Sequence, residues 1–221
     1  MPGAGTIVRV MTVRRALLLC GVLSSLLYVA MNVIVPARWP AYSSVSQTVS
    51  ELSAIGAPTR SLWAPLAYLY TALVAAFAWG VWRSADGSRP LRIVGALLGV
   101  YAALGLLWPL APMHQRAVLA AGGGTMSDTM HLALGGVTVL LMLMTIGFGA
   151  AAFGRVFRVY SIATIVVLLV FGLLTAVGAP AVSANQPTPL IGVWERINIS
   201  VFLLWVVIVA MNLPRDTASA G

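Results

Sequence analysis

The sequence predicts an all-α, polytopic integral membrane protein: a six-helix transmembrane bundle with a short amphipathic helix in an outer loop. The first reason is composition. Of the 221 residues, 60% are hydrophobic and only 8% are charged, and the mean hydropathy is +0.97. About a quarter of the residues of a soluble domain are charged. This chain has too few charged side chains to cover a surface in water, so lipid must cover it instead.

The second reason is a set of six apolar stretches, each close to the roughly 20 residues that a membrane-spanning helix needs. They comprise residues 16–35, 62–82, 91–110, 130–153, 160–179 and 197–213. Most connections between them are short, and only residues 36–61 and 111–129 are long enough to hold structure of their own. We therefore treat residues 1–221 as a single membrane domain.

The third reason is the unequal distribution of arginine between the two sets of span ends. One set carries nine arginines: Arg9, Arg14, Arg15, Arg83, Arg89, Arg92, Arg155, Arg158 and Arg215. The other set carries four: Arg38, Arg60, Arg116 and Arg196. Basic residues are retained on the cytoplasmic side during insertion. Both termini and the loops after spans two and four are therefore predicted to be cytoplasmic, and the two long loops face outward.

The basic residues also exclude some functions. The net charge is +8, and every basic residue is an arginine. Without lysine the chain cannot form a Schiff base, so it is neither a retinal nor a pyridoxal protein. The arginines are scattered through short connections rather than clustered on one face, which favours contact with membrane lipids and argues against a nucleic-acid partner.

The first outer loop contains a candidate catalytic residue, Glu51. Residues 42–56 read as a short amphipathic helix at the membrane surface, ended by Gly56 and Pro58. In a functional interpretation, Glu51 is a ligand or general base directed at the mouth of the bundle. In a structural one, the spacings Thr48-x-x-Glu51 and Ser44-x-x-Gln47 are capping boxes that satisfy free backbone N–H groups.

The second outer loop and the start of span four contain two histidines and a carboxylate. Asp128 and His131 share one helix face, and His114 lies across a short loop. These three residues are candidate ligands for a divalent metal such as zinc, or an acid–base pair. A haem held by the two histidines is a further alternative. Against these, Thr125-x-x-Asp128 has capping-box spacing, and an interfacial histidine is often only hydrogen bonded.

Span six begins with an acid and a base, Glu195 and Arg196, which are costly in a membrane unless paired or hydrated. Glu195 is a candidate catalytic residue. Arg196 is able to bind a phosphate or carboxylate, with Arg116 and Asn32 as further substrate-binding candidates. In the structural alternative, Glu195 complements the helix N terminus and Arg196 extends to the lipid head groups.

Three motifs in register resemble a bacterial membrane-protein family known as domain of unknown function 998. They are Ser46-Gln-Thr-Val-Ser50-Glu51-Leu52, His131 at the start of span four, and Gly192-Val-Trp-Glu195-Arg196-Ile197. The resemblance implies a six-span fold in the bacterial cytoplasmic membrane and no established activity. Members often carry a Pro-Cys-Asp-like element where this chain has Pro112-Met113-His114.

These observations lead to one leading hypothesis and two alternatives. The polar candidates all map to the outer side, which favours an enzyme that acts on a lipid or isoprenoid-linked substrate through Glu51, His131 and Glu195. The first alternative is a small-solute or proton-coupled transporter that uses the same residues. The second is a non-catalytic scaffold or assembly factor, in which they only cap helices and pair charges. The sequence does not indicate an oligomeric state.

Overall fold

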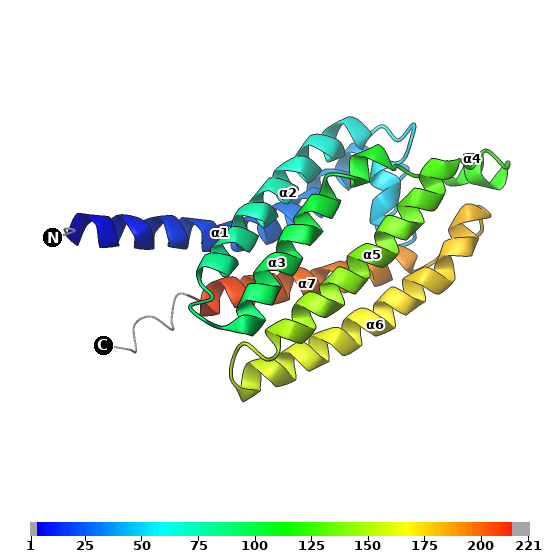
Figure 1. Cartoon of the computed structure of the whole chain (residues 1–221). Coiled ribbons are helices and arrows are strands. Elements are labelled where there is room, and N and C mark those ends of the chain that lie inside the picture. The colour runs from blue at the N-terminus through cyan, green and yellow to red at the C-terminus, as the bar shows by residue number, and fades with distance from the viewer. Residues whose placement is uncertain (1–3, 214–221) are drawn as a thin grey trace.

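A computed structural model describes the backbone of residues 4–213 and the side chains of residues 13–213 (Figure 1). Six long helices account for most of the chain: α1 (Ala4–Ile34), α2 (Arg60–Arg83), α3 (Arg89–Gly105), α5 (Met126–Gly149), α6 (Arg155–Ser183) and α7 (Ile191–Asn212). Each is part of a segment long and apolar enough to cross a membrane. The prediction of a six-helix membrane bundle is confirmed.

The connections hold four short helices: η1 (Pro36–Arg38), η2 (Val49–Ser53), η3 (Trp108–Leu110) and α4 (Arg116–Ala120). All four lie at the end of the bundle opposite the described ends of α1 and α7 (Figure 1). We call residues 35–59, 106–125 and 184–190 at this end the outer cap. The prediction that both long loops lie on one side is consistent with this arrangement.

Two helices differ from the predicted spans at a proline. The third span reaches Leu110 as predicted, but its α-helix ends at Gly105 and a 3₁₀ turn follows, because Pro109 disfavours the α conformation at Trp108. Helix α6 continues through Pro180 to Ser183, although the sequence suggested a loop there. A proline inside a membrane helix is tolerated because neighbouring groups compensate for the missing N–H.

The outer-loop helix is shorter than predicted, since only Val49–Ser53 is helical and the helix is of the 3₁₀ type. Side chains compete for the backbone just before it. The Ser43 N–H donates to the Gln47 side-chain oxygen at 2.8 Å, and the Ser46 N–H donates to the Ser43 hydroxyl at 3.3 Å. Such local bonds offer the backbone an alternative to an α-helix.

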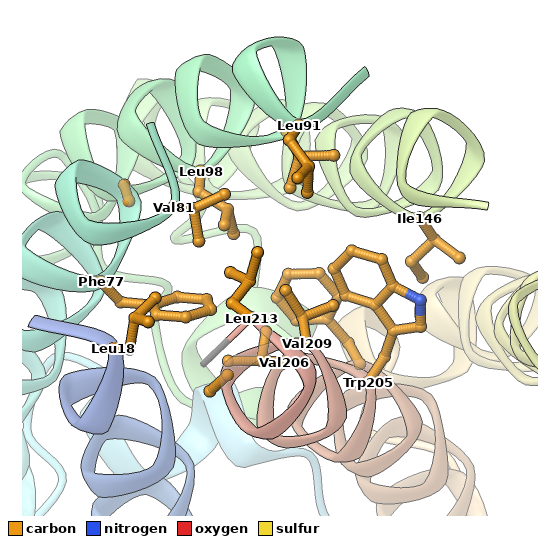
Figure 2. Close-up of a cluster of buried hydrophobic side chains, with 14 of the residues drawn as sticks. Leu18, Phe77, Val81, Leu91, Leu98, Ile146, Trp205, Val206, Val209 and Leu213 are labelled. Atoms are coloured by element: carbon orange, nitrogen blue, oxygen red, sulfur yellow. The ribbon is translucent and has the colours of Figure 1, made fainter. Parts of the chain in front are cut away.

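The six spanning helices form a closed ring. Each packs against the next along the chain, and α7 returns to pack against α1. The half of the ring farther from the outer cap is filled by a hydrophobic cluster to which all six helices contribute, including Phe77, Leu98, Ile146 and Trp205. Figure 2 shows these side chains pointing toward one another between the helices. Trp205 is fully buried in this cluster.

Hydrogen bonds from Arg14 of α1 stabilise the same half of the ring. Its Nε donates to the Ser84 hydroxyl at 2.8 Å, and its Nη2 donates to the Leu213 carbonyl at 3.2 Å. Arg14 therefore joins the ends of α2 and α7 to α1. Of the other arginines used to orient the chain, Arg215 lies outside the described residues, and only the backbone of Arg9 is described.

Candidate functional site

Glu51 forms a buried ion pair with Arg116. Arg116 Nε donates to Oε1 at 2.7 Å and Nη2 donates to Oε2 at 2.8 Å, and Glu51 is only 3% exposed. The Gln47 side chain and the Thr48 N–H donate to the same carboxylate at 3.0 and 2.7 Å. Burial by itself raises the pKa of Glu51, but these hydrogen bonds outweigh it and hold the pKa below its ordinary value. The predicted Thr48-x-x-Glu51 capping box is confirmed.

Arg116 also joins the first outer loop to the loop after α6. Its Nη1 donates to the Thr188 hydroxyl at 2.7 Å, and its Nη2 donates to the Ser46 carbonyl at 3.0 Å. The Thr188 hydroxyl in turn donates to the same Ser46 carbonyl at 2.8 Å. One guanidinium thus connects three segments of the outer cap.

Arg196 makes a second connection of this kind. Its Nη1 donates to the carbonyls of Ser44 and Gln47 at 2.9 and 3.1 Å, and its Nη2 donates to the Tyr42 hydroxyl at 2.7 Å. Gly192, one turn earlier on α7, lies so close to the first loop that a Cβ would collide with the carbonyls of Ser44 and Gln47. Helix α7 and the first loop therefore pack backbone against backbone.

His114 and Asp128 form a pair that holds the second outer loop against the start of α5. The backbone N–H of His114 donates to Asp128 Oδ1 at 2.7 Å, and its Nδ1 lies 2.8 Å from Oδ2. Oδ2 also accepts from the Thr125 N–H at 2.8 Å, in the predicted capping box. The carboxylate of Asp128 is therefore used for capping and for fixing the loop.

The three residues predicted as metal ligands do not come together. Among the described residues, no three side chains of His, Cys, Asp or Glu are grouped so that they could hold a metal ion. His114 is bound to Asp128, whereas His131 Nδ1 lies 2.8 Å from the Ala111 carbonyl oxygen.

A cavity of about 650 Å³ fills the half of the ring next to the outer cap. Its walls are mostly apolar and come from α2, α3, α5, α6 and α7. Its ionisable lining residues are Arg60, Asp128, His131 and Glu195, in addition to three tyrosines, Tyr28, Tyr70 and Tyr101. Concave, mostly apolar cavities with a few converging polar groups are typical of ligand sites.

The cavity is open toward the membrane between α5 and α6. Leu132 and Leu173 line it and are 64% and 65% exposed on the surface that faces lipid. Gly136, one turn after Leu132 on α5, also lines the cavity, and a Cβ added there would meet nothing within 4 Å. These exposed lining residues make the cavity accessible from the side of the bundle at α5 and α6.

His131 and Glu195 each line the cavity with an atom that has no described hydrogen-bond partner. His131 is 7% exposed, and its Nε2 is buried without a hydrogen bond from any described residue. Glu195 accepts a short hydrogen bond from the Val49 N–H with Oε2, while its Oε1 has no partner among residues 13–213. An unsatisfied buried polar atom costs about 1–3 kcal/mol, so His131 Nε2 marks a place where a ligand is expected, and Glu195 Oε1 is a further free acceptor of the cavity lining.

The structure thus divides the predicted site residues into two groups. His131, Glu195 and Asp128 line the cavity. The remaining candidates do not line it: Glu51, His114, Arg116, Arg196 and Asn32. Asn32 donates to the Tyr28 carbonyl of its own helix at 3.0 Å, so it has no described contact with the cavity.

Other lining residues were not predicted from the sequence. Thr138 lies two turns after His131 on α5, and its hydroxyl is buried without a described partner. Its position two helical turns after His131, on the same face of the helix, could have indicated it from the sequence. Arg60 lines the cavity while it donates to the Ser53 and Pro109 carbonyls at 3.2 and 3.4 Å, contacts that no spacing in the sequence indicates.

Comparison with known proteins places the chain in a family. No curated protein and no solved structure matches it. The sequence model of one family, described as "Protein of unknown function (DUF998)", matches residues 22–212 and so covers nearly all of the described chain. The chain belongs to the DUF998 family of proteins of unknown function.

Proposed function

We propose that this protein is a membrane enzyme that binds a lipid in the cavity between its helices and acts on it through Glu195 and His131. The observation that carries the proposal is the pair of atoms without partners, Glu195 Oε1 and His131 Nε2, in a cavity that is otherwise mostly apolar and open toward the bilayer. An apolar chain fits the walls, and its head group would lie near these two residues.

Both residues have the chemistry of general acid–base catalysts. A carboxylate and an imidazole are the groups that most often transfer protons in enzymes. Glu195 is held by the Val49 N–H and His131 by the Ala111 carbonyl, so each has one atom fixed and the other directed at the ligand. Glu51 acts indirectly, because its ion pair with Arg116 holds the loop that contains Val49.

The structural alternative explains part of the polar cluster. Glu51 and Arg116 are paired within the outer cap, and Arg196 donates to the cap through both Nη atoms, as a scaffold would require. It does not explain Glu195 Oε1 and His131 Nε2, which have no described partner. We therefore prefer an enzyme for the cavity and a structural role for the cap.

The resemblance to a bacterial membrane-protein family supports a location in the bacterial cytoplasmic membrane, and the arginine distribution supports a cytoplasmic position of both termini. The cap end then faces outward, and the cavity draws its lipid from the outer leaflet. Cysteine accessibility tests this orientation, since a single cysteine introduced at Gly122 of the outer cap should react with an impermeant reagent in intact cells.

Lipid entry is tested by narrowing the opening. Replacing Gly136 by leucine places a side chain in open space at the mouth of the cavity, without a clash inside the protein. Gly147 of the same helix is also exposed with open space in front of it, but it does not line the cavity, so Gly147→Leu is a matched control. We expect native mass spectrometry to show bound lipid in the wild type and in G147L, but much less in G136L.

Equal lipid occupancy in both leucine variants would contradict lateral entry at Gly136.

Catalysis is tested separately, by incubating the purified protein with a bacterial lipid extract and following each lipid by mass spectrometry. Conversion of a lipid class by the wild type, reduced by at least about 100-fold in Glu195→Gln, is the expected result. Bound lipid without any conversion would refute the enzyme and leave only a lipid-binding protein.

A further inference from the structure

We infer that the lipid head group is an uncharged or cationic hydrogen-bond donor, a hydroxyl or an ammonium group, and not a phosphate or carboxylate. The inference rests on the proposed lipid site and specifies its ligand. The lining side chains that have no hydrogen-bond partner within the protein determine which head group fits.

The hydrogen bond of His131 determines which of its ring nitrogens carries the proton. Its Nδ1 lies 2.8 Å from the Ala111 carbonyl oxygen, and a carbonyl only accepts, so Nδ1 carries the proton. In the neutral ring Nε2 is then a lone-pair acceptor. A protonated ring would bury a charged N–H without a partner, which costs more than leaving a neutral nitrogen unpaired. His131 therefore presents an acceptor to the cavity.

Glu195 lines the cavity from α7, whereas His131 lines it from α5. The Oε2 atom of Glu195 accepts from the Val49 N–H, and an ionised carboxylate has no donor of its own. In its ionised form Glu195 therefore offers Oε1 as a second acceptor. An anionic head group placed here would repel this carboxylate in a medium of low dielectric constant.

The arginines near the cavity make most of their described hydrogen bonds to the outer cap. Arg116 and Arg196 do not line the cavity, and they donate to Glu51, to hydroxyls and to loop carbonyls, while Arg196 Nε is buried without a described partner. Arg60 lines the cavity but donates to two carbonyls. None of these guanidinium groups makes the two-point contact with the cavity interior by which arginine usually binds phosphate.

The remaining polar groups of the wall do not change this balance. Asp128 has both oxygens occupied by His114 and Thr125. The hydroxyls of Tyr70 and Tyr101 lie 3.0 Å apart and bind each other. The Thr138 hydroxyl has no described partner and is able either to donate or to accept, so it fits any head group.

The test compares three probes with the same hexadecyl chain: hexadecanol, hexadecylamine and hexadecyl phosphate. Each competes with a fluorescent long-chain alcohol for the full-length protein in lipid nanodiscs. We expect the alcohol or the amine to compete at least about tenfold better than the phosphate, because a hydrogen bond to a charged acceptor contributes that much affinity. Whichever of the two competes better identifies the donor.

Two variants examine the acceptors directly. Glu195→Gln keeps an oxygen for the Val49 N–H and replaces the Oε1 acceptor by an amide donor, so the preference over phosphate should shrink about tenfold. His131→Asn keeps a donor for the Ala111 carbonyl and removes the Nε2 acceptor. Asp86→Asn, an exposed carboxylate at the opposite end of the bundle, is the control and should leave the preference unchanged.

Equal or stronger competition by the phosphate, or an unchanged preference in Glu195→Gln, would overturn the inference while lipid binding itself stands. If the fluorescent alcohol binds and none of the three probes displaces it, the donor head group is likewise refuted. If the wild type binds neither the fluorescent alcohol nor any lipid in native mass spectra, the proposed function has failed, and this inference with it.

Discussion

The two glutamates at the cap end have similar positions and different surroundings. Glu51 accepts hydrogen bonds on both oxygens, from an arginine, a glutamine and a backbone N–H, and is almost fully buried. Glu195 accepts one described hydrogen bond and leaves its second oxygen facing the cavity. A structural carboxylate thus has its acceptor sites occupied by the protein, whereas a candidate catalytic one keeps a free oxygen.

The largest effect on stability is expected from Arg116→Met. The substitution leaves the buried Glu51 carboxylate without its cation, and breaking one side of such a pair costs about 3–5 kcal/mol. Unfolding in mixed micelles, followed by circular dichroism, measures this loss. The double variant E51Q/R116M removes both charges and should recover a large part of it. A loss below about 1 kcal/mol in Arg116→Met would show that the pair behaves as a solvated surface pair.

A smaller effect is expected from acid. The pKa of Glu51 is lower in the folded protein than in the unfolded chain, where a glutamate titrates near 4.3. The stabilisation from this carboxylate is therefore complete above that pH and is lost as the pH falls through the lower folded pKa. The unfolding temperature should decrease on acidification below about pH 4.3, and Glu51→Gln should remove this part of the decrease. An identical pH profile in Glu51→Gln would contradict the assignment.

The fold could be predicted because its determinants are local in the sequence. Six apolar stretches define the six spans, since hydrophobic length alone decides whether a helix crosses a membrane. The capping boxes at Thr48 and Thr125 were also predictable, because they depend on residues three positions apart. What could not be predicted was the first outer loop, where the Gln47 side chain competes with the helix for backbone N–H groups.

The site could be predicted only in part, because the contacts that divide its residues are long-range. The Arg116 guanidinium reaches Glu51 across 65 positions of the chain, and Glu195 reaches Val49 across 146. No spacing in the sequence shows that Arg116 is used in the cap while Glu195 keeps a free oxygen. The sequence therefore indicated that the polar residues gather on one side, and the structure was needed to separate the cap from the cavity.

The most direct test of this division compares Glu51→Gln with Glu195→Gln in one experiment. Lipid retention is measured by native mass spectrometry and stability by unfolding in micelles. We predict that Glu51→Gln lowers stability and retains lipid, whereas Glu195→Gln changes stability by less than about 1 kcal/mol and retains lipid about tenfold more weakly. Lipid loss that follows stability in both variants, or full lipid retention in Glu195→Gln, would contradict a ligand site at the free oxygen of Glu195.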